Sequence, residues 1–200
     1  MARNDGIPKT MEVQKKGNLW FISVTYSCMP KRELGEQIHA FDWGIENFLT
    51  LADESENVSL IENPRFLKSA LPKIEKIQQS LSRKKFGSTN RRKLKTRLGR
   101  FHHKIANCRL DFMHKTSCRL VEKSKRLITE KLQIKNITKS PQPKKNEITG
   151  EYLPNGAAAK AGLNQSILDT SPSQFLQMMR IKAEEAAYKL EELDTKMLKP

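Results

Sequence analysis

One stretch of the sequence, residues 64–126, carries all of the chain's excess positive charge. It holds 20 Lys and Arg residues against three acidic residues, whereas the whole 200-residue chain has a formal net charge of +15. A positive field concentrated on one element attracts a polyanion, and nucleic acid is the usual one. We therefore expect this stretch to contact phosphates, which position a nucleic acid without reading its sequence.

Apolar residues within this stretch recur at helical spacing on both sides of Gly87. Gly87, followed by Ser88 or Thr89 as a cap, predicts that one helix ends and another begins there. Two helices joined by a short turn are expected to form an antiparallel hairpin, because each apolar stripe needs the other for cover. The stripes are Leu67, Leu71, Ile74, Ile77 and Leu81, and then Leu94, Leu98, Phe101, Ile105, Phe112, Thr116 and Leu120. The cations expected to bind phosphates are Arg83, Lys84, Lys85, Arg91, Arg92, Lys93, Arg97, Arg100, Lys104 and Arg109.

Strand patterns flank the helical stretch on both sides. Short alternating runs predict a β-hairpin over 9–26, a three-stranded meander over 37–61 and a further strand over 126–132. The composition of residues 141–164, rich in Pro, Gly, Asn, Lys and Ala, predicts a mobile surface loop. Ser171 is expected to cap a helix that has Pro172 in its first turn, and residues 190–198 have the pattern of a last strand.

Composition excludes several classes of protein. No run of about 18 apolar residues is present, so we expect no membrane-spanning helix, and the first residues lack the apolar segment of a secretory signal. The three cysteines, Cys28, Cys108 and Cys118, are widely spaced and form no CxxC pair. We therefore expect free thiols in a reducing cytoplasm.

Histidine and tryptophan each allow two interpretations. His102, His103 and His114 lie among arginines on the second helix, and a zinc site would need more ligands at fixed spacing. We expect these histidines on the helix surface, facing phosphate. Trp20 and Trp43 could stack on bases, but their positions in strands favour the hydrophobic core for both.

Two acidic residues lie in strands on either side of the basic stretch. Asp42 is inside the otherwise apolar run 40–44, where an unpaired carboxylate is costly, so we expect it to have a partner such as a metal ion or a cationic side chain. Glu130 follows the apolar residues 127–129. Each carboxylate could cap its strand or meet a lysine such as Lys131. Alternatively, the two lie at adjacent strand ends and hold Mg²⁺, which prefers oxygen ligands and supports phosphodiester displacement.

The segment from Asp42 to Leu51, with the sequence DWGIENFLTL, resembles the first catalytic motif of the RuvC-like nuclease domain in TnpB (OrfB) proteins of insertion sequences. Those proteins are RNA-guided relatives of type V CRISPR effectors. Glu130, within the block 128–132, is similar to the second catalytic motif. Further blocks resemble the same family, at 62–65, 81–93, 104–115 and 162–169, so the resemblance covers about residues 38–200.

The resemblance implies an α/β protein with an RNase H-like (RuvC-like) mixed sheet and the basic helical hairpin inserted in it. It implies that Asp42 and Glu130 are two of three metal-binding, catalytic carboxylates for Mg²⁺. It also implies DNA and an element-encoded guide RNA as partners, in a prokaryotic cytoplasm close to the nucleoid and away from membranes. The corresponding parts are 1–36, the end of an N-terminal β (wedge) region; 37–63, the first RuvC-like part; 64–126, the hairpin; and 127–200, the second RuvC-like part.

Departures from the family pattern bear on activity. Family members continue into a four-cysteine zinc ribbon and a third catalytic aspartate, and this sequence offers no match to either, so we expect no zinc site here. Asp169 precedes Ser171-Pro172 and is expected to cap that helix, while Lys131 stands where an acid is common and would disturb metal binding at Glu130. We expect an incomplete set of carboxylates to lose most or all metal-dependent cleavage.

Two other functions remain open from the sequence. The chain could be a non-catalytic nucleic-acid-binding protein or regulator built on the basic hairpin. If the resemblance is set aside, a basic RNA-binding protein of a ribosome-associated kind also fits the charge pattern. That last interpretation predicts no proximity between Asp42 and Glu130.

Overall fold

A five-stranded mixed sheet forms the centre of the protein in a computed structural model that describes residues 6–17, 19–28 and 32–194. The strand order is β5-β4-β3-β6-β9, and the first three strands form the antiparallel meander that the sequence predicts. β6 and β9 extend the sheet in parallel with β3. The strands are β3 (Gln37–Trp43), β4 (Asn47–Asp53), β5 (Val58–Glu62), β6 (Ser124–Glu130) and β9 (Glu191–Leu193).

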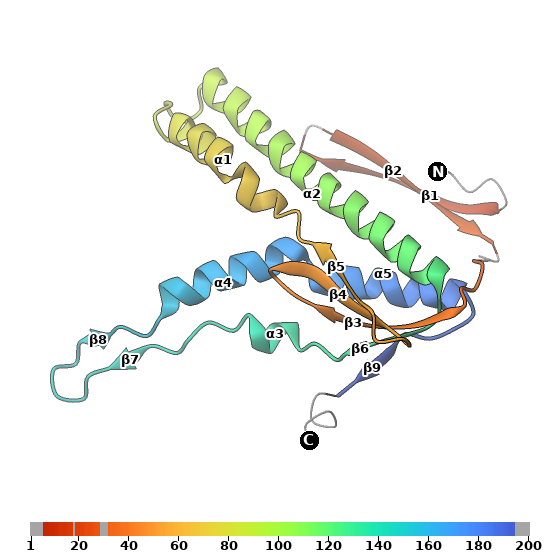
Figure 1. The fold of residues 1–200 in the computed structure, drawn as a ribbon. Coiled ribbons are helices and arrows are strands. Elements are labelled where there is room, and N and C mark those ends of the chain that lie inside the picture. Colours follow the sequence, from red (N-terminus) through yellow and green to blue (C-terminus); the bar gives the residue numbers. More distant parts are fainter. Residues whose placement is uncertain (1–5, 18, 29–31, 195–200) are drawn as a thin grey trace.

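The basic stretch forms two helices, α1 (Phe66–Ser82) and α2 (Thr89–Lys123), which lie side by side between β5 and β6 in the chain (Figure 1). Gly87 has a positive φ of 77° in the turn between them, and the Ser88 hydroxyl accepts a hydrogen bond from the Arg91 backbone N–H at 3.2 Å. Ser88 therefore caps α2 as predicted. The 35-residue α2 ends at Lys123 and β6 begins at Ser124, with no residue between them.

Helices cover one face of the sheet, and the described part of the chain leaves the other face open. On the covered face, the β3 residues Phe41 and Trp43 are buried in a core with side chains of α2 and of α5 (Pro172–Glu185). Phe175 of α5 contacts Phe48 of β4, with ring centroids 4.9 Å apart. The burial of Trp43 confirms the prediction that it is a core residue.

The segment between β6 and α5 differs from the predicted loop. It contains α3 (Ile134–Ile137), two short strands β7 (Lys144–Lys145) and β8 (Tyr152–Leu153), and α4 (Ala157–Thr170). The prediction of a loop over 141–164 is wrong from Ala157 onward, because its alanine run favours a helix. Lys160 and Asn164 hold α4 against the α3 region by donating to the carbonyl oxygens of Ile137 and Thr138 at 2.6 and 2.7 Å.

Ser171 occupies the N-cap position of α5 as predicted, but its side chain makes no capping hydrogen bond. Its backbone is left-handed, with φ 49°, and its hydroxyl donates to the Leu168 carbonyl oxygen at 3.3 Å instead. The reason is that α4 runs as far as Thr170, so Ser171 makes a tight corner between two helices. Pro172 occupies the first turn of α5 as expected.

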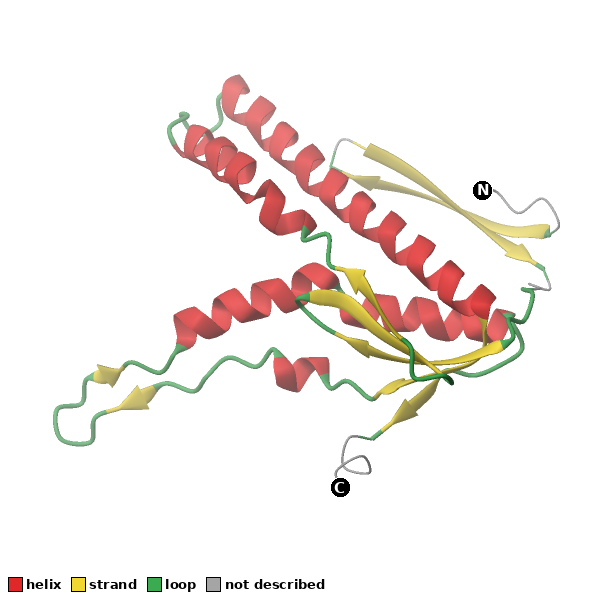
Figure 2. Ribbon diagram, viewed as in Figure 1, coloured by secondary structure: helices red, strands yellow, loops and turns green. Residues whose placement is uncertain are grey.

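A separate two-stranded ribbon, β1 (Ile7–Lys16) and β2 (Leu19–Ser27), confirms the predicted N-terminal hairpin. It lies along α2 and away from the central sheet (Figure 2). Phe21 contacts His103 of α2, with ring centroids 5.3 Å apart, while Trp20 on the opposite face is 67% exposed. The prediction that Trp20 is a core residue is therefore wrong.

The cysteines that the sequence left unpaired, Cys28, Cys108 and Cys118, are free thiols in the structure. Within the described ranges, no helix combines the length and the apolar character needed to cross a membrane.

Candidate functional site

Asp42 and Glu130 occupy equivalent positions on two adjacent parallel strands. The register of β3 and β6 pairs Phe41 with Thr129, and the Thr129 hydroxyl donates to the Phe41 carbonyl oxygen at 2.9 Å. Asp42 and Glu130 are one residue further along, at the carboxyl ends of strands that are about 4.8 Å apart. Because side chains alternate along a strand, the burial of Phe41 and Thr129 directs the two carboxylates to the open face of the sheet.

Neither carboxylate has a protein partner among the described residues. Asp42 is exposed and Glu130 is half-buried, and neither makes a side-chain hydrogen bond or an ion pair within the described part of the chain. Of the two partners expected for Asp42, a cationic side chain is not found among the described residues, and its strand is apolar on one face only. Lys131 does not bind Glu130 either; its backbone N–H donates to the Leu193 carbonyl oxygen at 2.8 Å.

The pair fits part of a site for a hard divalent cation. Such an ion takes carboxylate oxygens as ligands, and two neighbouring carboxylates without a cationic partner are favourable for it. The described residues contain no group of three or more His, Cys, Asp or Glu side chains that could hold a metal ion. The structure therefore places two candidate ligands together.

Asp169 caps a helix, but it is α1 and not the helix that follows it. Its carboxylate accepts hydrogen bonds from the Leu67 backbone N–H at 3.0 and 3.2 Å and from Arg109 Nη2 at 2.6 Å. Arg65, which directly precedes α1, provides no side-chain cap, so the start of this helix depends on Asp169. The contact joins α4 to both α1 and α2 across separations of 102 and 60 residues, which a local pattern could not reveal.

Two of the predicted phosphate-binding cations are used inside the protein. The Arg109 side chain is 21% exposed and is paired with Asp169, so we remove it from the nucleic-acid set. Arg91 Nη1 donates to the carbonyl oxygens of Leu81 and Lys84 at 2.8 and 3.2 Å and so fastens the turn between the helices. The other eight are exposed: Arg83, Lys84, Lys85, Arg92, Lys93, Arg97, Arg100 and Lys104.

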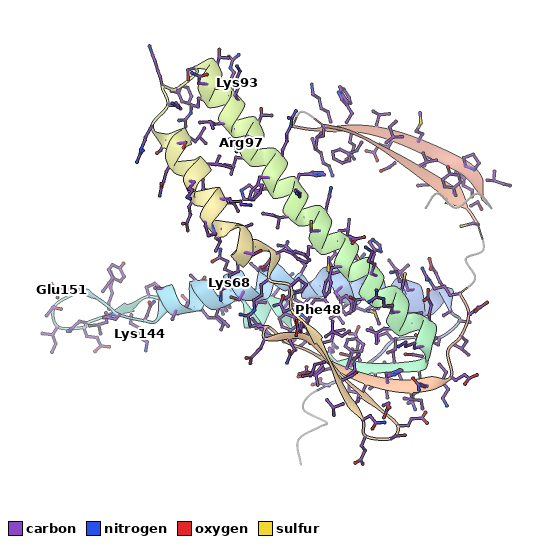
Figure 3. All side chains as sticks on the ribbon, turned by 45° about the horizontal axis from the view of Figure 1, so that its top comes forward. Phe48, Lys68, Lys93, Arg97, Lys144 and Glu151 are labelled. Atoms are coloured by element: carbon purple, nitrogen blue, oxygen red, sulfur yellow. The ribbon has the colours of Figure 1, made fainter. Side chains whose placement is uncertain are left out.

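A cavity of about 480 Å³ between α1 and α2 extends this cationic surface. Arg97, Arg100 and Lys104 of α2 line it, together with Lys73 and Lys76 of α1. Figure 3 shows Lys93 and Arg97 on the part of α2 that is furthest from the sheet. Sequence reasoning missed the two lysines because it treated α1 mainly as an apolar stripe, although its helical spacing also predicts their shared face.

The environment of one histidine of α2 changes its pKa. Partial burial, followed by the neighbouring Lys182, lowers the pKa of His114 from its ordinary value. Lys182 is buried and donates to the His114 carbonyl oxygen at 2.8 Å and to Ser117 Oγ at 2.7 Å, which joins α5 to α2. His103 packs against Phe21 of the ribbon, as described above.

The geometry described above can be compared with known proteins. A sequence profile of the family OrfB_IS605, described as "Probable transposase", matches residues 10–141. The chain belongs to the OrfB_IS605 family. The match spans β1 to α3 and therefore contains both Asp42 and Glu130, as well as the whole of α1 and α2.

Two curated relatives agree with this assignment. A "Putative RNA-guided DNA endonuclease" of Streptomyces pristinaespiralis is 31% identical over an alignment of 138 residues that covers 66% of this chain and 33% of that protein. The "Putative RNA-guided DNA endonuclease InsQ" of Escherichia coli (strain K12) is 29% identical over an alignment of 175 residues that covers 82% of this chain and 39% of that protein. This OrfB_IS605 chain thus spans between a third and two fifths of the length of these relatives.

A solved structure supports the fold. The cryo-EM structure of a Cas12f1-sgRNA-target DNA complex contains a protein that aligns with 93% of this chain and 36% of its own, with a TM-score of 0.55 and 10% identity. At this identity the likeness bears on the fold alone. The mixed α/β architecture of the OrfB_IS605 chain therefore recurs in Cas12f1.

Proposed function

We propose that this chain is the part of an RNA-guided, metal-dependent DNA endonuclease that supplies two metal ligands, Asp42 and Glu130, on an RNase H-like sheet. The observation that carries the proposal is the β3–β6 register, which sets the two carboxylates side by side at adjacent strand ends on an open face. The names of the curated relatives support the reaction class.

Two groups of residues in this chain would have separate roles: the carboxylates would bind a metal ion and the cations would bind nucleic acid. Mg²⁺ bound by the two carboxylates would supply charge stabilisation at a phosphodiester and activation of water. Asp42 and Glu130 are kept in position by the hydrogen-bonded strand pair, so their spacing does not depend on a flexible loop. The exposed cations of α1 and α2 would hold the phosphates of the nucleic acid at the end of the helix pair that is distant from the sheet.

Metal binding by the pair is the first test of this function. We expect Asp42→Asn and Glu130→Gln each to weaken Mn²⁺ binding at least ten-fold, because each removes a charged oxygen ligand. Electron paramagnetic resonance of Mn²⁺ titrated into the purified protein measures this. Glu62→Gln is the matched control, since Glu62 is an exposed carboxylate at the end of β5 in the same sheet. Equal Mn²⁺ affinity in all four proteins would contradict the metal site.

Cleavage is the second test, and it separates two functions. The purified protein is incubated with Mg²⁺, guide RNA transcribed from the element and matched DNA. Cleavage that disappears in Asp42→Ala would establish the nuclease. The second candidate is a non-catalytic nucleic-acid-binding protein, which is favoured by the exposed cations and by the two-carboxylate site. It predicts binding of RNA or DNA that is the same in wild type and Asp42→Ala, with no cleavage by either.

A further inference from the structure

The cavity between α1 and α2 has cations on both sides, and none of the described residues that line it is acidic. Lys73 and Lys76 line it from α1, and Arg97, Arg100 and Lys104 line it from α2. None of the five makes an ion pair within the described ranges of the chain. Five unneutralised cations around one cavity repel one another, and an anionic ligand relieves that repulsion.

Apolar residues also line the same cavity. They are Ile77 of α1 and Leu94 and Phe101 of α2, and Phe101 is half-buried against the core of the helix pair. A site for a duplex backbone needs cations but gains nothing from an apolar lining, because the bases of a duplex are stacked inside it. An aromatic side chain in the same cavity as the cations instead suits a strand whose bases are free to stack on it.

The dimensions of the cavity agree with a short single strand. From Arg97 to Lys104 the helix rises by about 10 Å, which is room for about two or three nucleotides. A volume of about 480 Å³ falls within the range of roughly 300–1,000 Å³ that small-molecule sites have, so a nucleotide can enter it.

We propose that the α1–α2 cavity binds a single-stranded segment of nucleic acid, with its phosphates on the five cations and a base on Phe101. This inference rests on the proposed function and specifies which form of nucleic acid this surface takes. In a guided nuclease such a segment is either unpaired guide RNA or a displaced DNA strand, and the shared chemistry is a flexible polyanion with exposed bases.

Binding of labelled oligonucleotides to the full chain tests the proposal. Fluorescence anisotropy compares a 12-nucleotide poly-uridine, a 12-nucleotide poly-thymidine and a 12-base-pair duplex over a series of salt concentrations. We expect at least one single strand to bind more tightly than the duplex. Lys76→Glu with Arg100→Glu should weaken that binding at least ten-fold and flatten its salt dependence, because phosphate contacts are lost. The surface control is Lys144→Glu with Lys145→Glu, on the exposed strand β7, which should change affinity less than three-fold.

Two further measurements keep the outcome clear. Circular dichroism checks that each variant is folded, and Lys76→Gln with Arg100→Gln provides a milder change that should weaken binding in the same direction. Photocrosslinking of a 5-bromouridine strand should modify peptides containing Ile77, Leu94 or Phe101. Duplex binding that equals or exceeds both single strands, or crosslinks confined to other elements, would overturn the proposal. Asp42→Asn should leave this binding unchanged, so failure of the metal site and failure of the strand site are distinguishable.

Discussion

Replacing Gly35 by alanine is expected to lower the free energy of unfolding by about 3 kcal/mol or more, the upper range for forcing extra atoms into a packed site. A Cβ atom at this position would overlap the backbone carbonyl group of Lys123 and the backbone nitrogen of Ser124. That backbone cannot move away easily, because Ser124 is fully buried at the start of β6 and its hydroxyl donates to the Leu120 carbonyl oxygen at 2.7 Å.

The matched control for this change is Gly99→Ala, in the middle of α2. A Cβ atom there meets no heavy atom within 4 Å. Since alanine restricts the unfolded chain and favours a helix, we expect Gly99→Ala to raise the free energy of unfolding by about 0.5–1 kcal/mol. Urea denaturation followed by circular dichroism measures both. If the two substitutions changed the free energy of unfolding by similar amounts, the proposed clash between a side chain at position 35 and the backbone of Lys123 and Ser124 would be contradicted.

Replacing Asp169 by alanine is expected to lower the free energy of unfolding by about 3–5 kcal/mol, the usual loss when one partner of a buried ion pair is removed. The substitution leaves Arg109 without its partner and the first turn of α1 without its cap. Asp169→Asn should lower the free energy of unfolding by less than Asp169→Ala does, because the amide oxygen can still accept a hydrogen bond from the Leu67 N–H.

Two comparisons decide whether the Asp169 contact acts as a unit. The double variant Asp169→Ala/Arg109→Ala should lose clearly less free energy of unfolding than the sum of the losses in the two single variants, because the residues share one interaction. Asp111→Ala is the control, since its ion pair with Lys115 is more than half exposed on both sides and should contribute no more than about 1 kcal/mol. Additive effects of Asp169 and Arg109, or equal effects of Asp169 and Asp111, would contradict the coupled contact.

Local patterns in the sequence predicted most of the elements, because strands and helices depend on spacings of two and of three to four residues. The meander, both long helices and the cap at Ser88 follow from neighbours in the chain. The start of α4 at Ala157 was missed because residues 141–164 were treated as one loop on their average composition, although the alanine run from Ala157 favours a helix. Ser171 holds the N-cap position of α5 without a side-chain cap, because it also ends α4 and cannot take the extended backbone that side-chain capping requires.

Side-chain environments were harder to predict than elements, because burial depends on what covers a face. Residues 40–44 are apolar apart from Asp42, which suggests a buried strand. Asp42 is nevertheless exposed, because only alternate residues of the strand face the core. Trp20 lies on a clearly apolar face of the ribbon, but none of the described residues buries it. The Asp42–Glu130 arrangement was reached through family resemblance, and the register that produces it depends on a parallel pairing across 88 residues.

The direct passage from α2 into β6 has a mechanical consequence. A helix of 35 residues is about 52 Å long, so it acts as a rigid arm, with the exposed cations toward its far end and the Glu130 strand at its base. With no residue between helix and strand, a turn of the arm by only about 5° moves the far end by about 4–5 Å, estimated from that length. When bound nucleic acid moves the far end of α2, no flexible linker separates that movement from β6.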